Sequence, residues 1–274
     1  MGQVVHTLPG GEEVFGVTSL DNKIFVLRDK VYRYDQLEVH DVITYRLKRY
    51  LTVPNARGFT DMTSCKHYHC LYIGDVECVH RLGVGPHGAV TRWPVSDRPS
   101  GLSVNAAHNV IVTCPFVGKI KEFSSHGDLL RELTLPDDVI NPRHTIQSRS
   151  GQFIVSHGYF DDPIHRVCMI SADGRHIVHS HGGLRGSDIG QYNWPGHLEV
   201  DDDNKCVYVV DIDNRRVTLL SPTLDYIREV VSCDKLKGLP ARLHLDVKRR
   251  RLYVVESEVK DDKSTAGRVM VFSV

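Results

Sequence analysis

The sequence has no excess of charge, no long apolar segment and no glycosylation acceptor. Its 274 residues carry 34 Lys and Arg against 34 Asp and Glu, which argues against a wholly basic nucleic-acid-binding protein. No apolar run approaches the ~20 residues that cross a bilayer, the first residues do not form a signal peptide, and no Asn-x-Ser/Thr occurs. The seven cysteines are odd in number and mostly lie in apolar runs, where cysteine behaves as a small buried hydrophobic residue. We therefore expect a cytoplasmic protein with reduced thiols that does not contact membranes.

Motifs of the common enzyme classes are also missing. The sequence contains no G-x-S-x-G nucleophile elbow and no Walker loop. Its glycine-rich stretch at 83–88 lies between two expected strands and opens no helix. We expect no catalytic residues and no cofactor.

What the sequence does have is a repeat. Six prolines are spaced by 45, 45, 43, 53 and 45 residues, namely Pro9, Pro54, Pro99, Pro142, Pro195 and Pro240. Three of these units share apolar residues three and five positions after the proline, followed by Asn or Asp and then by a strongly apolar run. A second pattern, an aliphatic residue, then Ser, turn-forming residues and another aliphatic residue, recurs in three units and is typical of strand, tight turn, strand.

Each unit therefore holds about four short strands and no helical periodicity, which predicts an all-β fold. Six such units of about 45 residues are typical of a six-bladed β-propeller with four-stranded antiparallel blades. We expect a single domain over 1–274, with blades at about 9–53, 54–98, 99–141, 142–194, 195–239 and 240–274 plus 1–8. The last unit has only three strands, so the N-terminal strand at Val4–Leu8 is expected to complete the last blade and close the ring.

The fifth unit resembles a known family. Its residues Asp211, Asn214, Arg215, Arg216 and Val217 match the D-x-x-N-R-V core of the NHL repeat, although the full motif occurs in this unit alone. The chain thus resembles a divergent propeller of the NHL type. The resemblance implies recognition of proteins or RNA.

Two groups of residues are candidate metal sites. Cys65, His67, His69 and Cys70 are zinc ligand types, but no second cluster completes them. Asp75 lies 21 residues after its proline, against 16 for Asp211 in unit five, so we expect a long turn between the first two strands of blade two.

The second group is His144 and His197, which occupy the same position two residues after their prolines, where Arg242 and Gly101 are the counterparts. These side chains are expected to surround one mouth of the central channel. A channel metal would need an inward carboxylate, and no third ligand occurs at the matching position, so we expect no metal.

The binding face is predicted from insertions in blade four. Extra residues fall between its second and third strands and after its fourth strand, and both segments emerge on the same face. They carry aromatic residues, the usual anchors of recognition surfaces. The predicted binding residues are Phe116, His144, His157, Tyr159, Phe160, Tyr192, Trp194, His197, Arg215 and Arg242.

These patterns favour a monomeric, non-catalytic propeller that binds a protein or peptide on this face. Two alternatives stay open: a channel-metal enzyme of the lyase or lactonase kind, and an RNA-binding domain of the NHL type. The basic run at 248–251 is expected to be a solvated turn on the opposite face.

Overall fold

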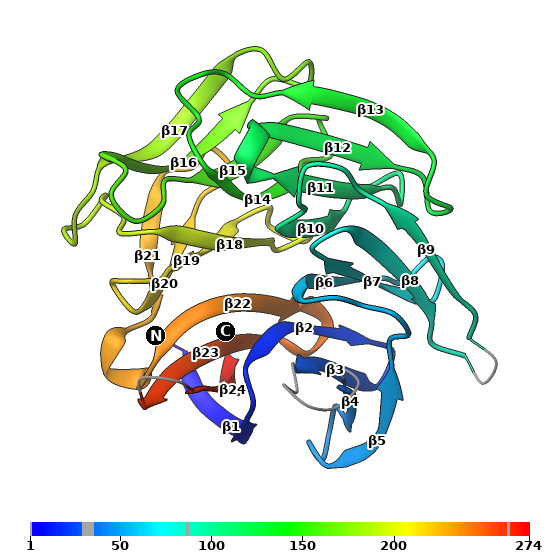
Figure 1. Cartoon of the computed structure of the whole chain (residues 1–274). Helices are drawn as coiled ribbons and strands as arrows, with labels where there is room; N and C mark the ends of the chain where they lie inside the picture. Colours follow the sequence, from blue (N-terminus) through cyan, green and yellow to red (C-terminus); the bar gives the residue numbers. More distant parts are fainter. Residues whose placement is uncertain (1, 29–35, 86–87, 262–263) are drawn as a thin grey trace.

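The protein is a ring of six four-stranded antiparallel sheets around a central channel (Figure 1). The structure is a computed structural model and describes residues 2–28, 36–85, 88–261 and 264–274. The helices in this part of the chain are single 3-10 turns, η1 (Pro115–Val117), η2 (Cys233–Lys235) and η3 (Val247–Arg249), and none is long and apolar enough to cross a membrane. The predicted all-β propeller is confirmed.

Each sheet is one blade, and its strands are called A to D from the channel outward. Blade one holds β2 (Val14–Leu20), β3 (Lys23–Arg28), β4 (Gln36–Asp41) and β5 (Leu47–Thr52). Blade two holds β6 (Phe59–Cys65), β7 (Cys70–Asp75), β8 (Cys78–Gly83) and β9 (Val90–Pro94). Blade three holds β10 (Gly101–Val104), β11 (Val110–Cys114), β12 (Lys119–Phe123) and β13 (Leu129–Thr134).

The second half of the ring repeats this order. Blade four holds β14 (Pro142–Gln147), β15 (Phe153–His157), β16 (Ile164–Ile170) and β17 (Ile177–Leu184). Blade five holds β18 (Pro195–Val200), β19 (Val207–Asp211), β20 (Arg216–Leu220) and β21 (Tyr226–Val231). Blade six holds β22 (Leu239–Asp246), β23 (Arg251–Asp261), β24 (Ser264–Ser273) and β1 (Gln3–Gly11).

The core is divided among the six spaces between neighbouring blades. One hydrophobic cluster fills each space, such as the cluster of Phe25 and Leu27 from blade one with Leu71 and Ile73 from blade two. Strand B is covered on both faces, because its alternate residues pack against the blade before and the blade after it. This explains why these strands read as continuous apolar runs rather than alternating ones.

The N-terminal strand closes the ring as predicted. β1 pairs antiparallel with β24 as the outermost strand of blade six, with Leu8 opposite Val269 and Gln3 opposite Ser273. Leu8 is completely buried and packs in the cluster between blades six and one. Pro9 lies within β1, so the inner strand of blade one begins only at Val14.

The prediction of a long A–B turn in blade two is wrong. Only four residues separate β6 from β7, at 66–69. The extra residues instead precede β6, because Pro54 lies near the start of the loop at 53–58, five residues before that strand begins.

A polar pair joins the end of strand B to the start of strand C in several blades. In blade five the buried Asp211 accepts hydrogen bonds from Asn193 N (2.8 Å), Asn214 Nδ2 (2.8 Å) and Arg216 Nε (2.7 Å). In blade two Asp75 and the Nε2 atom of His80 are 2.7 Å apart. The residues that resemble the NHL repeat thus hold the B–C turn against the loop that enters the blade.

Candidate functional site

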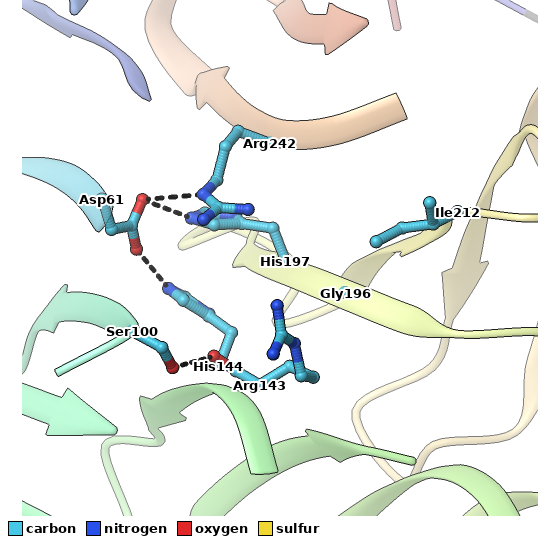
Figure 2. Close-up of a pocket in the computed structure, with 8 residues that line it drawn as sticks. All are labelled: Asp61, Ser100, Arg143, His144, Gly196, His197, Ile212 and Arg242. Atoms are coloured by element: carbon cyan, nitrogen blue, oxygen red, sulfur yellow. Dashed lines mark hydrogen bonds and ion pairs between the residues drawn. The ribbon is translucent and has the colours of Figure 1, made fainter. Parts of the chain in front are cut away.

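The inner strands bring equivalent residues together at one end of the channel. Five of the six A strands contain a register shift near their first residues. The residues at this level of the inner strands are Gly16, Asp61, Gly101, His144, His197 and Arg242. Figure 2 shows that the four with charged or ring side chains point toward one another. We call Asp61, His144, His197 and Arg242 the axial cluster.

Asp61 is the member that the sequence analysis missed. Counting forward from Pro54 fails, because the insertion before β6 shifts the strand away from its proline. Counting back from the end of strand B succeeds: Asp61 lies 14 residues before Asp75, just as His197 lies 14 before Asp211. The sequence therefore did contain the signal for an inward carboxylate.

Asp61 is at the centre of the axial cluster and is 1% exposed. Its Oδ1 atom is 3.3 Å from Arg242 Nε and 3.6 Å from His197 Nε2, and its Oδ2 atom is 3.6 Å from His144 Nε2. The carboxylate also accepts hydrogen bonds from the backbone N–H groups of Met62 (2.9 Å) and Leu102 (2.8 Å). The rings of His144 and His197 stack with their centroids 3.9 Å apart.

Burial and charge set the protonation of this cluster. Burial raises the pKa of Asp61, but His197, Arg242 and His144 outweigh it and lower the pKa to about 2. Burial, and then the neighbouring His197, lower the pKa of His144 to about 3. At neutral pH the cluster therefore holds a carboxylate and a neutral His144 beside the Arg242 guanidinium.

Three members of the axial cluster are metal-ligand types, because Asp61, His144 and His197 offer ligand atoms within 4.8 Å of one another. Both ring nitrogens of His144 are already used: Nδ1 accepts from Leu198 N (3.3 Å), and Nε2 donates to the carbonyl oxygen of Leu102 (3.0 Å). Arg242 places a permanent positive charge beside the carboxylate that a cation would need. The donor set in this arrangement does not fit a divalent cation.

The space beside the axial cluster is small. A cavity of about 20 Å³ is lined by the cluster together with Ser100, Arg143, Gly196 and Ile212 (Figure 2). That volume holds about one water molecule and no organic substrate. Gly101 keeps this space tight, because a Cβ atom there would lie 2.9 Å from the His144 ring.

Next to this cavity, the two insertions of blade four meet as predicted. Tyr159 and Phe160 lie in the B–C turn, and Trp194 lies in the loop that leads to blade five. The ring centroids of Tyr159 and Trp194 are 4.8 Å apart, and those of Tyr159 and Phe160 are 5.7 Å apart. We call Tyr159, Phe160 and Trp194 the aromatic cluster. Phe160 is 60% exposed, whereas Trp194 is half-buried.

Arg143 connects the two clusters. Its guanidinium lies over the rings of Tyr159 (4.9 Å) and Trp194 (5.8 Å), and it also lines the small cavity. Burial, and then the charge of Arg242, lower the pKa of Arg143 to about 10. No carboxylate of the described residues pairs with it.

Four other predicted binding residues lie apart from the two clusters. Phe116 and Arg215 are exposed in the B–C turns of blades three and five, on the same face as the aromatic cluster. Tyr192 is a correction: it is 1% exposed and its hydroxyl pairs with Thr218 Oγ1, so it packs between blades instead of facing a ligand. His157 is a second correction, because it is completely buried and accepts a hydrogen bond from Arg166.

The cysteine and histidine side chains of blade two contact different neighbours. Cys65 and Cys70 are buried between blades two and three, whereas His67 stacks on His108 at 4.1 Å and His80 binds Asp75. Within the described ranges, the one group of three or more metal-ligand types that converge is the axial set of Asp61, His144 and His197.

No protein-family model matches the sequence, and no curated protein matches it. Solved structures share the fold. A streptogramin B lyase is 12% identical with a TM-score of 0.64, over 96% of this chain and 83% of that one. Virginiamycin B lyase from Staphylococcus aureus is 11% identical with a TM-score of 0.64, over 100% and 99%. A protein of unknown function from Bacteroides caccae is 12% identical with a TM-score of 0.65, over 89% and 86%. At such identities the likeness shows the fold alone, which is a six-bladed β-propeller.

Proposed function

We propose that this chain is a recognition propeller that binds a protein or peptide, without catalysis at the binding surface, on the face formed by the B–C turns and the loops between blades, here called the B–C face. The observation that carries the proposal is the aromatic cluster beside Arg143. Exposed aromatic rings next to an arginine are the side chains that most often dominate binding energy at protein interfaces.

The backbone of the aromatic cluster supports a binding role. Phe160 and Trp194 have φ values of 49° and 66°, in the left-handed region that bulky residues rarely occupy. Such conformations cost about 1–3 kcal/mol each and are frequent at ligand-binding sites. Neighbouring hydrogen bonds hold them: Asp162 accepts from Tyr159 N (2.8 Å), and Trp194 N donates to His165 Nδ1 (2.9 Å). A surface fixed in this way loses little entropy when a partner binds.

Charge defines the chemistry of the partner. Arg143 brings a positive charge to the aromatic cluster without an acidic partner among the described residues, and the Nε1 atom of Trp194 is buried without a hydrogen-bond acceptor. A ligand carboxylate would neutralise the charge of Arg143, and a carbonyl or carboxylate oxygen of the ligand would accept a hydrogen bond from Trp194 Nε1. We therefore infer a peptide segment with an acidic residue next to an apolar one.

The repeat family, the oligomeric state and the cellular location of the protein are also part of the proposal. The hydrogen bonds of Asp211 with Asn214 and Arg216 support a propeller of the NHL type. We also propose that the protein is monomeric and cytoplasmic and that its thiols are reduced. RNA recognition is the competing outcome within this type. It predicts an affinity that falls steeply with salt, because each neutralised phosphate releases counterions.

A channel-metal lyase is the second candidate, favoured by the convergence of Asp61, His144 and His197. The engaged nitrogens of His144, the guanidinium of Arg242 and the water-sized cavity count against it. Elemental analysis of the purified chain separates the candidates, since about one bound metal per chain would favour the lyase.

The recognition proposal is tested with a random-peptide display library selected on the purified chain. Enriched peptides should contain an acidic residue beside an apolar one, and fluorescence anisotropy then measures the affinity of one synthetic peptide. Phe160→Ala and the Phe160→Ala/Trp194→Ala double variant should weaken binding tenfold or more, about 1.4 kcal/mol. Arg143→Gln should weaken binding of acidic peptides selectively.

The matched control is Ile43→Ala, which removes a side chain that is 71% exposed in a C–D turn of blade one. It should leave the affinity unchanged. Unchanged affinity in Phe160→Ala, whose side chain supports little of the fold, would refute the proposed face. Tighter binding of a labelled RNA oligonucleotide than of the selected peptide, with an affinity that falls steeply with salt, would instead support RNA recognition.

A further inference from the structure

The channel also contains a group of side chains that the proposed recognition face does not use. Ser19 of β2, His244 of β22 and Glu199 of β18 come from blades one, six and five, which are consecutive around the ring. The Oγ atom of Ser19 is 2.9 Å from Nε2 of His244, and Nδ1 of His244 is 3.1 Å from Oε1 of Glu199. One serine, one histidine and one carboxylate are thus joined in series.

The hydrogen bonds of His244 determine which of its two ring nitrogens can act as a base. Glu199 accepts from Nδ1–H of His244, and its Oε1 atom also accepts from the backbone N–H of Leu245 (3.2 Å). With the proton on Nδ1, the Nε2 atom is a free base that accepts the hydroxyl proton of Ser19. A serine activated by a histidine that a carboxylate orients is the arrangement of nucleophilic acyl transfer.

A large cavity adjoins the histidine and the carboxylate of this group. It has a volume of about 940 Å³ and is lined by residues of the inner strands and of the A–B turns, including His244, Glu199 and Thr18. It therefore opens on the face opposite the B–C face, here called the A–B face. Ser19 itself is 5% exposed and does not line the cavity, but its hydroxyl is hydrogen-bonded to His244, which does.

We propose that Ser19, His244 and Glu199 form a nucleophilic serine site that hydrolyses esters of small acyl groups. Ser19 Oγ attacks the carbonyl carbon of the ester while its proton moves to Nε2 of His244. The tetrahedral adduct breaks the carbon–oxygen bond to the alcohol, and the alcohol leaves with the proton from His244. Water then attacks the acyl-serine and gives a proton to His244, which returns it to Ser19 Oγ as the carboxylic acid leaves.

Each residue has a separate role in this step. Ser19 forms the covalent bond, and His244 moves the proton. Glu199 is a positioning residue, because it acts through His244. The burial of Ser19 restricts the site to small acyl groups, whereas the wide cavity beside His244 accepts alcohols of varied shape.

The test is covalent labelling of the purified full chain with diisopropyl fluorophosphate, a small reagent that phosphorylates activated serines. Intact mass and peptide mapping should locate one adduct on Ser19, and p-nitrophenyl acetate should be hydrolysed with a burst of about one product per chain. Ser19→Ala should abolish the adduct and the burst. His244→Gln should slow labelling by about 100-fold or more.

Glu199→Gln should slow labelling while leaving Ser19 as its site, since that variant keeps the base but loosens its orientation. Ser103→Ala is the matched control: Ser103 is a buried serine that lines the cavity beside His244, but its hydroxyl donates to the Thr145 carbonyl oxygen (2.7 Å) instead of a histidine. It should label like the unmodified chain. The absence of an adduct on Ser19 in the unmodified chain, or equal labelling of Ser103, overturns the proposal even if every variant misfolds.

Discussion

His157 lies at the end of β15 with no exposed surface, and its Nε2 atom accepts a hydrogen bond from Arg166 Nε at 2.9 Å. Burial, and then the charge of Arg166, lower the pKa of this histidine from 6.5 to about 4. The unfolded chain therefore takes up a proton first as the pH falls. The stability that depends on a neutral His157 is complete above pH 6.5 and is lost progressively toward pH 4.

This linkage gives a prediction at the residue scale. Between pH 7 and pH 5, His157 should remove about 1–2 kcal/mol of the free energy of unfolding. His157→Gln should be less stable at pH 7 but should lose correspondingly less stability on going to pH 5, as measured by urea unfolding at both values. His176→Gln, which changes an exposed turn histidine, should keep the original pH dependence. If His157→Gln loses as much as the unmodified chain, the acid sensitivity arises elsewhere.

The sequence was least informative about the positions of individual side chains. The pairing of His144 with His197 could be predicted, because both follow their prolines by two residues. Asp61 was missed since an insertion breaks that count in blade two, and Tyr192 was misplaced since an aromatic residue in a loop can turn inward as well as outward. The series of Ser19, His244 and Glu199 could not be predicted at all. Its members come from three blades, and only the closed ring brings them together.

At the scale of elements, the sequence was a better guide. Apolar runs such as Val207–Asp211 became B strands, because a strand covered by a blade on each side has no polar face. The turn-forming residues between strands C and D were equally informative. The strand boundaries of blade two were not, since Pro54 there belongs to a loop and not to the start of a strand.

The closing strand β1 carries the element-scale prediction. Leu8→Ala should lower the free energy of unfolding by about 2–5 kcal/mol, because it leaves a cavity between blades six and one. Val5→Ala on the same strand should change it by less than about 0.5 kcal/mol, since Val5 is 42% exposed. Urea unfolding of both variants measures the difference. Equal effects would show that β1 contributes through its backbone alone.

At the scale of the whole molecule, the axial cluster divides the channel into two compartments. The B–C face ends in a cavity of about 20 Å³, whereas the A–B face opens into about 940 Å³, and His197 lines both. The side chains of the axial cluster leave room for about one water molecule between them. A ligand on either face therefore has no direct contact with a ligand on the other.

The two proposed sites should therefore act independently. A saturating concentration of the selected peptide should leave the rate of Ser19 labelling within twofold of the free protein, and Phe160→Ala should also leave that rate unchanged. Conversely, Ser19→Ala should bind the peptide with unchanged affinity. A peptide that slows labelling by tenfold or more would reveal a coupling of about 1.4 kcal/mol between the faces, and the axial cluster would be its most direct route.

The position of β1 has a mechanical consequence. Gln3, at the beginning of β1, pairs with Ser273, at the end of β24, so the two ends of the chain lie side by side (Figure 1). A force that pulls these two residues apart loads the hydrogen bonds of the β1–β24 ladder one after another, beginning at that end. The buried Leu8 stabilises the closed ring against heat and denaturant. A pulling force applied at these two residues instead separates β1 from β24 one hydrogen bond after another.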